Sequence, residues 1–273
     1  MTNLNSDAIQ ISIMKIFANA DSHNERAIKT KDELIKCLDE YSIINVDDIT
    51  EADIIFSIGG DGTFLKTARM SSGKPIIGIN TGTLGYLTEI RPDDLKKALR
   101  DIEKGNYNIE NRMMLEGEII KANGETVSIP ESLNEISISK NMIGVVRFDV
   151  IVNGKLINSY TADGMLVCTP TGSTAYNLSC GGPIVDPTAE IITLTPIAPH
   201  TVINRSIVLS NDSVVEIKIT ELRDNTSSYV LYDGLPIEVF GGDSIKIKKS
   251  ERITKIIKLE DNSFIDTIRE KIS

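Results

Sequence analysis

Cysteine and histidine are both scarce in this chain of 273 residues, which has three cysteines and two histidines. Cys37, Cys168 and Cys180 match no zinc-binding spacing, and their number is odd, so we expect reduced thiols rather than a disulfide framework. Two histidines cannot build a histidine-rich metal centre. The sequence therefore predicts no metal site made by protein side chains alone.

Long apolar runs are also missing. No run approaches the roughly 20 residues that a membrane-spanning helix needs. Residues 1–10 are polar and lack the basic-then-apolar order of a secretory signal. From these absences we expect a cytoplasmic protein with no membrane partner.

The sequence also lacks a dense block of Lys and Arg residues. The net charge is −10, and the most basic segment, Lys246–Lys249, alternates like the solvated face of a strand. This argues against nucleic-acid binding. A phosphorylated small molecule remains open, because backbone amides and one metal ion can hold phosphate without a basic protein.

What is present is ordinary globular composition, 41% hydrophobic and 25% charged, in a length that allows one or two domains. Residues 1–108 alternate between strand-like and helix-like patterns, which predicts an α/β domain with a Rossmann-like parallel sheet. The expected strands are 9–17, 53–58 and 75–80. The expected helices are 24–38 and one that begins at Pro92 and ends before Gly105.

Residues 109–255 are rich in strand-like runs. Asn123-Gly124 and Asn153-Gly154 each separate two such runs, which is a strong signal for hairpins. Further expected strands are 206–209, 214–219, 228–231, 237–240 and 244–248. We expect a β-rich second domain, and a helical tail within 256–273 that returns to the first domain.

The segment Gly59-Gly60-Asp61-Gly62-Thr63 directly follows a buried strand and precedes a helix-like run. Glycines let a ligand approach the backbone, and a helix start offers free amides to phosphate. Such loops lie at the carboxyl ends of strands, where α/β sheets bind ligands. Asp61 could accept a hydroxyl proton, hold Mg²⁺, or simply cap the helix.

Two further segments carry polar groups suited to a nucleotide. Asn134-Glu135 supplies an amide beside a carboxylate, although a solvated turn would look the same. The segment 163–185 places a short buried strand, 165–168, before a crowd of hydroxyls and glycines. These crowded residues are Thr169, Thr171, Gly172, Ser173, Thr174, Ser179, Gly181 and Gly182. A Ser/Thr-rich surface loop is the alternative, but an apolar strand before it and Gly-Gly-Pro after it favour a ligand site.

Together these segments resemble the NAD kinase family, in particular its bacterial members that use ATP or polyphosphate. The family's Gly-Gly-Asp-Gly-Thr stands at 59–63, its Asn-Glu pair at 134–135, and its Asp-Gly with Thr-Pro-Thr-Gly-Ser-Thr-Ala-Tyr at 163–164 and 169–176. Pro-His-Thr at 199–201 and Asp-Gly at 233–234 complete the match. The first motif also occurs in lipid kinases and phosphofructokinase-like enzymes, whereas 169–183 is specific.

The resemblance implies that the chain transfers the terminal phosphoryl group of ATP, or of another donor, to the 2′-hydroxyl of the adenosine ribose of NAD. NAD would lie between the domains. Asp61 would be the general base, and Mg²⁺ or another divalent cation would arrive with ATP. The implied donor-phosphate contacts are Gly59, Gly60, Gly62 and Thr63. The implied NAD contacts are Asp61, Gly62, Lys66, Asn134, Glu135, Asp163, Thr174, Ala175, Tyr176, Asn177, Ser179 and Ala198. The family forms homo-oligomers, so a homotetramer or homodimer is expected.

Two departures from the family pattern concern the edge of the NAD site. Many members have a basic residue two places before the Asp163 match, where this chain has Thr161. Many bacterial members have Gln after the late Asp-Gly, where this chain has Leu235. Both put peripheral NAD contacts in doubt without touching the proposed chemistry.

Three competing functions remain to be weighed. A lipid kinase shares the glycine motif but gives no reason for the 169–176 segment, and no exposed basic amphipathic helix is evident. A non-catalytic NAD-binding regulator would not need Asp61. A dehydrogenase would need Gly-x-Gly-x-x-Gly after a strand, and that pattern is absent. The phosphoryl donor, the use of NADH, feedback by NADP and the oligomer number stay open.

Overall fold

Two structural units divide the chain. The computed structural model describes residues 13–82, 85–88, 90–141, 144–200, 204–222, 227–259 and 264–272. Among these, residues 13–109 and 257–259 belong to the first unit, and residues 110–256 and 264–272 belong to the second. Each unit has a hydrophobic cluster of its own.

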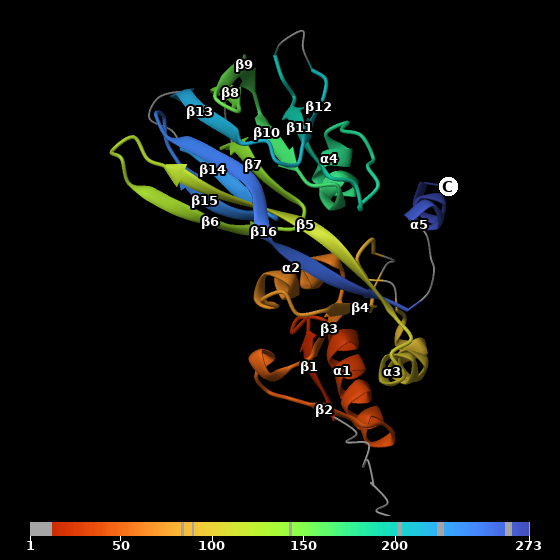
Figure 1. The fold of residues 1–273 in the computed structure, drawn as a ribbon. Helices are drawn as coiled ribbons and strands as arrows, with labels where there is room; N and C mark the ends of the chain where they lie inside the picture. The colour runs from red at the N-terminus through yellow and green to blue at the C-terminus, as the bar shows by residue number, and fades with distance from the viewer. Residues whose placement is uncertain are drawn as a thin grey trace, which may run out of the picture. The chain divides into compact units, whose positions relative to one another are not determined.

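The first unit is built on a parallel sheet in which four strands run in the order β2-β1-β3-β4 (Figure 1). The strands are β1 (Met14–Ala20), β2 (Ile43–Asn45), β3 (Ile54–Gly59) and β4 (Ile76–Asn80). Every residue of β3 and β4 is buried, as an apolar run of β-forming residues predicts for strands covered on both faces. The end of β16 (Ser244–Lys258) lies beside β4, where Ile257 joins the core of this unit.

Helices cover both faces of this sheet. On one face, Leu34 of α1 (Glu25–Cys37) and Leu99 of α3 (Leu95–Glu103) belong to the same buried cluster as Phe56 of β3. On the other face, α2 (Asp61–Met70) donates a hydrogen bond from Thr67 Oγ1 to Ser57 Oγ of β3, 3.0 Å away. Short 3₁₀ turns occupy Leu38–Glu40, Ile49–Glu51 and Pro92–Asp94.

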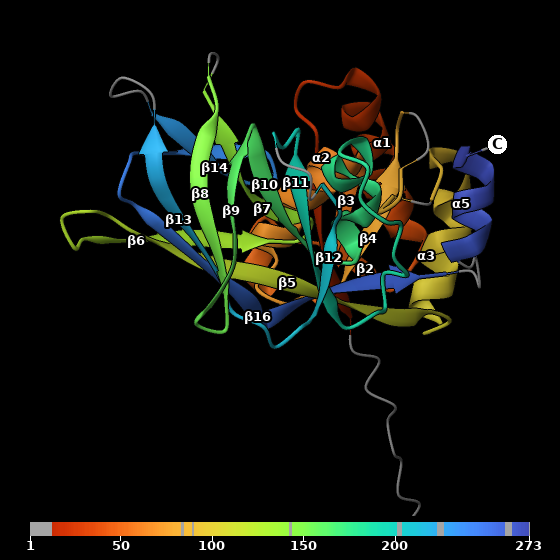
Figure 2. The same ribbon diagram turned by 90° about the horizontal axis from the view of Figure 1, so that it is seen from above.

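The second unit consists of two largely antiparallel sheets. One has the order β6-β5-β16-β13-β8-β9, and the other has the order β12-β11-β10-β7-β14-β15. Figure 2 shows β13, β8 and β9 running side by side. The strands of the first of these sheets, besides β16, are β5 (Asn108–Ile120), β6 (Thr126–Ser132), β8 (Val146–Val152), β9 (Lys155–Ala162) and β13 (Val215–Leu222).

Most of the predicted NAD contacts lie in segments next to or between the strands of the second of these sheets, and Glu135 lies in one of its strands. Its strands are β7 (Glu135–Lys140), β10 (Gly164–Cys168), β11 (Ile191–Ile197), β12 (Ile207–Ser210), β14 (Ser228–Tyr232) and β15 (Leu235–Val239). Phe148 of one sheet and Val167 of the other belong to one apolar cluster, so the two sheets share a core. The helical pieces are a 3₁₀ turn at Thr171–Thr174, α4 (Tyr176–Ser179) and α5 (Phe264–Ile272).

The expected α/β unit followed by a β-rich unit is confirmed, and both predicted Asn-Gly hairpins are present. The first strand was placed too early: it spans Met14–Ala20, because its pairing with β3 continues to Ala20, and residues 9–12 lie outside the described part. Strands β2 and β11 were not predicted, and β7 was expected only as a β-like stretch after Asn134-Glu135, without bounds. The stretch Ile257–Leu259 groups with the first unit and α5 groups with the second, and the return of the whole tail to the first domain stays a prediction.

Among the described residues, no helix has the length and apolar character that crossing a bilayer requires.

Candidate active site

The glycine motif forms the connection between β3 and α2. β3 ends at Gly59, Gly60 is the N-cap of α2, and Asp61 is its first helical residue. A Cβ at Gly59 would collide with the Thr63 side chain, so glycine is needed there for the helix to begin so close to the strand. The first amides of α2 have no partners within the helix, which suits them to an anion.

A cavity of about 400 Å³ opens beside this helix start, entirely within the first unit. Four of its lining residues are predicted site residues: Gly60, Gly62, Thr63 and Lys66. The others are the last two residues of β1 and the three residues after it: Asn19, Ala20, Asp21, Ser22 and His23. Sequence reasoning missed this second group. Only their position could have identified them, because they lie at and just after the carboxyl end of β1, which pairs with β3.

Asp61 does not line this cavity; its carboxylate binds the segment 85–88 of the same unit. Oδ2 accepts a hydrogen bond from Tyr86 N at 2.8 Å. Oδ1 accepts hydrogen bonds from Leu87 N at 3.1 Å and from Thr88 Oγ1 at 3.3 Å. A Cβ added at Gly85 would fall on Asp61 Oδ1. The capping role considered for Asp61 is therefore wrong, since Gly60 is the cap and the carboxylate is directed elsewhere.

In the second unit, the Asn134–Glu135 turn meets the Ser/Thr-rich segment. Asn134 O accepts a hydrogen bond from Thr169 N at 2.9 Å, and Leu133 O accepts one from Thr169 Oγ1 at 2.6 Å. A Cβ at Gly172 would collide with Asn134 O, so this backbone contact requires glycine. Two sequence motifs that are 35 residues apart thus form one structure.

The Asp-Gly motif at 233–234 also contacts the Asn134–Glu135 turn. Asp233 and Gly234 have φ values of 44° and 83° and form the two-residue turn between β14 and β15. The Asp233 carboxylate accepts hydrogen bonds from Leu133 N at 3.0 Å and Asn134 N at 2.8 Å. In return, Asp233 N donates to Glu135 O at 3.1 Å.

Glu135 is the most perturbed acid of this cluster. Its side chain is 8% exposed, and its Oε2 finds no hydrogen-bond partner among the described residues. Burial, and then the charge of Asp233, raise the pKa of Glu135 from 4.5 to about 8. Cys168 lies opposite Glu135 on β10, and burial raises the pKa of its thiol well above the usual range, so we expect it to be unreactive.

The segment 171–183 exposes some predicted contacts and buries another. Tyr176 is 41% exposed and Ser179 is exposed, whereas Thr174 and Ala175 are half-buried. Asn177 is fully buried: its Nδ2 donates to Ser173 O and Pro183 O, and its Oδ1 accepts from Thr195 Oγ1. The Asn177 side chain therefore holds the segment in shape, and any NAD contact through its backbone stays a prediction.

Asp163 lies at the other end of β7 and β10 from Glu135. The register pairs Cys168 with Glu135 and Gly164 with Ser139, so the two acids are separated by the length of these strands, about 17 Å at 3.4 Å per residue. Lys140 Nζ forms an ion pair with Asp163 Oδ1 at 2.8 Å, and sequence reasoning missed this lysine. Ala198 is exposed with a φ of 42°, while Thr201 of the Pro-His-Thr motif lies outside the described residues.

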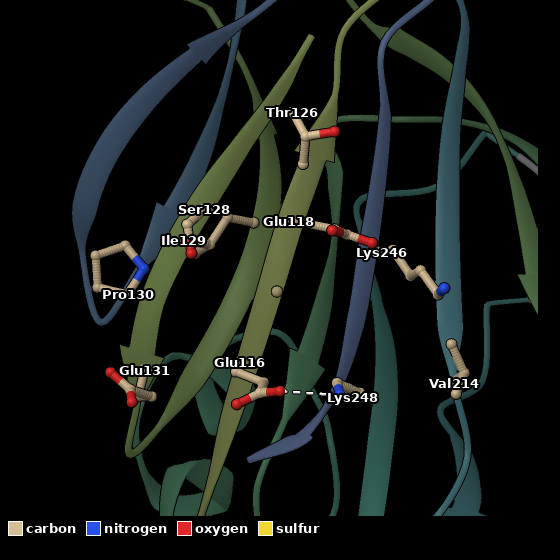
Figure 3. Close-up of a pocket in the computed structure, with 11 residues that line it drawn as sticks. Glu116, Glu118, Thr126, Ser128, Ile129, Pro130, Glu131, Val214, Lys246 and Lys248 are labelled. Carbon is tan, nitrogen blue, oxygen red and sulfur yellow. Dashed lines mark ion pairs between the residues drawn. The ribbon is translucent and has the colours of Figure 1, made fainter. Parts of the chain in front are cut away.

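A second hollow, of about 590 Å³, contains none of the predicted site residues (Figure 3). It lies over β5, β6 and β16, and its rim carries Glu116, Glu118, Glu131, Lys246 and Lys248. Lys248 Nζ and Glu116 Oε1 form an ion pair at 3.0 Å. Three carboxylates against two ammonium groups leave this hollow with a negative balance, which does not favour a nucleotide.

Comparison with known proteins gives concordant matches. The ATP-NAD kinase N-terminal domain matches residues 8–107, and the ATP-NAD kinase C-terminal domain matches residues 133–259. The NAD kinase of Thermoanaerobacter sp. (strain X514) is 40% identical over 239 residues, 86% of this chain and 83% of the relative. That of Caldanaerobacter subterraneus subsp. tengcongensis is 42% identical over 228 residues, 82% of this chain and 80% of the relative.

Solved structures agree on the fold. The NAD kinase of Archaeoglobus fulgidus, determined in complex with ATP, has a TM-score of 0.74 and 28% identity, and the match covers 94% of this chain and 98% of that one. Yeast NADH kinase, determined with NADH, has a TM-score of 0.86 and 23% identity, covering 95% of this chain and 87% of the other.

Proposed function

This chain belongs to the NAD kinase family and phosphorylates NAD to NADP, and from that premise we propose which of its atoms perform the reaction. The 2′-oxygen of the adenosine ribose attacks the γ-phosphorus of ATP. The bond from that phosphorus to the β–γ bridging oxygen breaks, and ADP leaves. The hydroxyl proton passes to the Asp61 carboxylate.

Asp61 is proposed as the general base because its carboxylate is fixed before substrate arrives. Its hydrogen bonds to Tyr86 N, Leu87 N and Thr88 Oγ1 remove most of its freedom to rotate. A carboxylate oxygen has lone pairs beyond those used by these donors, so one can still accept a proton. Such a base contributes about 10²–10⁴-fold to a rate.

The cavity beside α2 is proposed as the site of the donor phosphates. The amides of Gly60, Gly62 and Thr63 lie at the start of the helix. Lys66, which the resemblance assigns to NAD, lines the same cavity one turn later, and its positive charge can serve the donor phosphates as well. Phosphoryl transfer depends mainly on alignment and on neutralising phosphate oxygens, which is what these groups supply.

A divalent cation is proposed to enter with ATP rather than to reside in the protein. Among the described residues, no three His, Cys, Asp or Glu side chains gather as a metal site. Among the described residues that line the cavity, Asp21 is the one carboxylate, and it would hold such a cation against the phosphates. When bound, the cation would neutralise charge on the donor oxygens.

The second unit is proposed to bind NAD through the converging motifs. Asn134 and Glu135 offer an amide and a carboxyl to ribose hydroxyls, and the exposed ring of Tyr176 offers a stacking face to the adenine. Thr174, Ala175, Ser179 and Ala198 would supply further contacts, and Asp163 would contact the nicotinamide half.

The observation that carries this proposal is the meeting of Asn134–Glu135, Thr169–Gly172 and Asp233 in one hydrogen-bonded cluster. It gives a structural reason for the motif that separates NAD kinases from lipid kinases. ATP labelled on its γ-phosphate, incubated with Mg²⁺ and either NAD or diacylglycerol, tests the assignment. Label should appear in NADP and not in lipid; label in lipid alone would contradict the choice of acceptor.

We also propose that the protein is cytoplasmic, that it is a homotetramer or a homodimer, and that ATP is its phosphoryl donor, with polyphosphate as an alternative. Light scattering on the purified protein tests the oligomer. Parallel assays with ATP and with polyphosphate test the donor.

A further inference from the structure

The Asp233 carboxylate is the group that fixes the backbone of the Asn134–Glu135 turn. It accepts hydrogen bonds from Leu133 N and Asn134 N at 3.0 and 2.8 Å, and from Glu135 N at a longer 3.4 Å. Three consecutive amides therefore converge on one carboxylate. Since β6 ends at Ser132 and β7 begins at Glu135, these amides belong to the corner that presents both predicted NAD contacts.

We propose that Asp233 is a positioning residue for NAD: its carboxylate holds the corner that presents Asn134 and Glu135, and its charge acts directly on the Glu135 carboxyl. The inference rests on the proposed function, because it assigns a role relative to the NAD contacts named above. Asp233 acts through those two residues and is not itself assigned a contact with the reacting atoms.

Turn formation alone does not explain an aspartate at this position. Asn153-Gly154 forms the equivalent two-residue turn between β8 and β9, with φ values of 51° and 76°. There the side chain accepts one hydrogen bond, from Val214 N at 2.9 Å. Asparagine thus satisfies the turn itself. What Asp233 adds is a charge and a second acceptor oxygen, and both are directed at the Asn134–Glu135 corner.

The charge matters because Glu135 is buried beside it. Among the described residues, the titratable groups that interact with Glu135 are Asp233 from the β14–β15 turn, Cys168 from β10, Tyr176 from α4 and Cys180, the C-cap of α4. None of these groups carries a positive charge. Burial and then Asp233 raise the pKa of Glu135 to about 8, so Glu135 changes its ionisation within the range where kinases are assayed. A protonated carboxyl can donate a hydrogen bond to NAD, whereas an ionised one can only accept.

The test is the variant Asp233→Asn, which keeps the size of the side chain and the turn geometry but removes the charge and one acceptor. Losing a charge-assisted hydrogen bond to the corner should raise the KM for NAD about tenfold. Because the interaction concerns binding, kcat should change far less than KM. The pH at which KM for NAD changes should move to a lower value, because the pKa of Glu135 falls when the neighbouring charge is removed.

Asp243→Asn is the matched control. Asp243 also clamps a turn of the second unit, accepting hydrogen bonds from Ala122 N and Phe240 N at 3.0 Å each, and it is buried. The control should lower the melting temperature but leave both the KM for NAD and its pH profile as in the native protein. Calorimetric titration with NAD gives the same comparison as dissociation constants.

The outcomes separate the possibilities. An Asp233→Asn variant with native KM and native pH profile would overturn the proposal and leave Asp233 as a turn residue only. Should this variant fail to fold, the native protein and Glu135→Gln still decide: the KM for NAD should vary between pH 6.5 and 9.5 in the native protein and stay constant in Glu135→Gln. A constant KM in the native protein, or a KM of Glu135→Gln that varies as the native one does, would overturn the proposal. If the native protein formed no NADP, the proposed function would be contradicted instead. Calorimetric dissociation constants for NAD would then still test the positioning role.

Discussion

Both oxygens of the Asp61 carboxylate are engaged by the segment 85–88, so a substitution here changes local structure as well as charge. In Asp61→Asn, the side-chain NH₂ group would face the N–H of Tyr86 or Leu87, and the side chain could no longer accept a proton as a base. We expect NADP formation to fall by about 10²–10⁴-fold, as removal of a general base does. We also expect a lower melting temperature and retained NAD binding.

A Mg²⁺ series distinguishes the two chemical roles of Asp61. If the carboxylate held the cation, raising Mg²⁺ would recover much of the lost turnover, whereas a missing base is not recovered. Thr88→Val is the control, because it removes one hydrogen bond to Asp61 and keeps the charge. Near-native turnover of Asp61→Asn at any Mg²⁺ concentration would remove Asp61 from the reaction.

Glu135 should make stability depend on pH. Its pKa is raised in the folded protein from 4.5 to about 8, so the folded state holds this proton more tightly than the unfolded state. Its contribution to stability is full below about pH 4.5 and is lost as the pH rises through about 8. Glu135→Gln cannot ionise and should therefore gain stability relative to the native protein as the pH rises.

The measurement is the melting temperature of both ligand-free proteins at pH 5 and pH 9. The difference in favour of Glu135→Gln should grow by about 2 °C or more. Glu238→Gln, on an exposed position of β15, is the control and should show no such change. An unchanged difference for Glu135→Gln would mean that the carboxyl is not held protonated in the folded state.

Tyr176 is the third residue with a specific expectation. Stacking of a base on an aromatic ring is worth about 1–3 kcal/mol, so Tyr176→Ala should weaken NAD binding roughly ten- to hundredfold. Leu178→Ala is the control, because Leu178 lies on the same short helix and is 39% exposed against 41% for Tyr176. Equal affinities of the two variants in a calorimetric titration would contradict adenine stacking.

At the scale of elements, the segment 85–88 acts with the glycine loop, although the two are separated by α2 and β4. An alanine at Gly85 would drive its methyl into Asp61 Oδ1. Because a displacement of about 1 Å near the reacting atoms can cost about 10²-fold in rate, Gly85→Ala should reduce turnover strongly. Gly82→Ala meets no atom within 4 Å and serves as the control. Equal turnover of the two variants would mean that this contact does not orient Asp61.

Elements with a strong local pattern could be predicted from the sequence. β3 is a continuous apolar run that ends at glycine, and the Asn153-Gly154 hairpin follows from turn chemistry alone. The strands that were missed, β2 and β11, and the one that was expected without bounds, β7, lack such signals. β2 has three residues, β7 carries Glu135 and two serines among its six residues, and β11 contains Pro196 in its interior. Pairing on both sides stabilises β7 and β11, and the sequence does not display pairing.

At the scale of the whole molecule, the two-unit organisation follows from the change in sequence pattern near Asn108. The candidate site was predictable as a set of motifs but not as an arrangement. The hydrogen bond from Asn134 N to Asp233 joins residues 99 apart in the chain, and the ion pair of Lys140 with Asp163 joins two neighbouring strands. Spacing along a sequence carries no information about such contacts. The environment that perturbs Glu135 brings together Asp233 and Cys168, which are far from it in the chain.

The central claim is that this chain phosphorylates NAD, and one assay tests it most directly. The purified protein is incubated with NAD, ATP and Mg²⁺, and the product is measured with an NADP-specific dehydrogenase, while NAD binding is measured in parallel by calorimetry. The account predicts NADP that accumulates with time and requires both NAD and ATP. NAD that binds without any NADP being formed, with ATP or with polyphosphate as donor, would contradict the account and identify a non-catalytic NAD-binding protein instead.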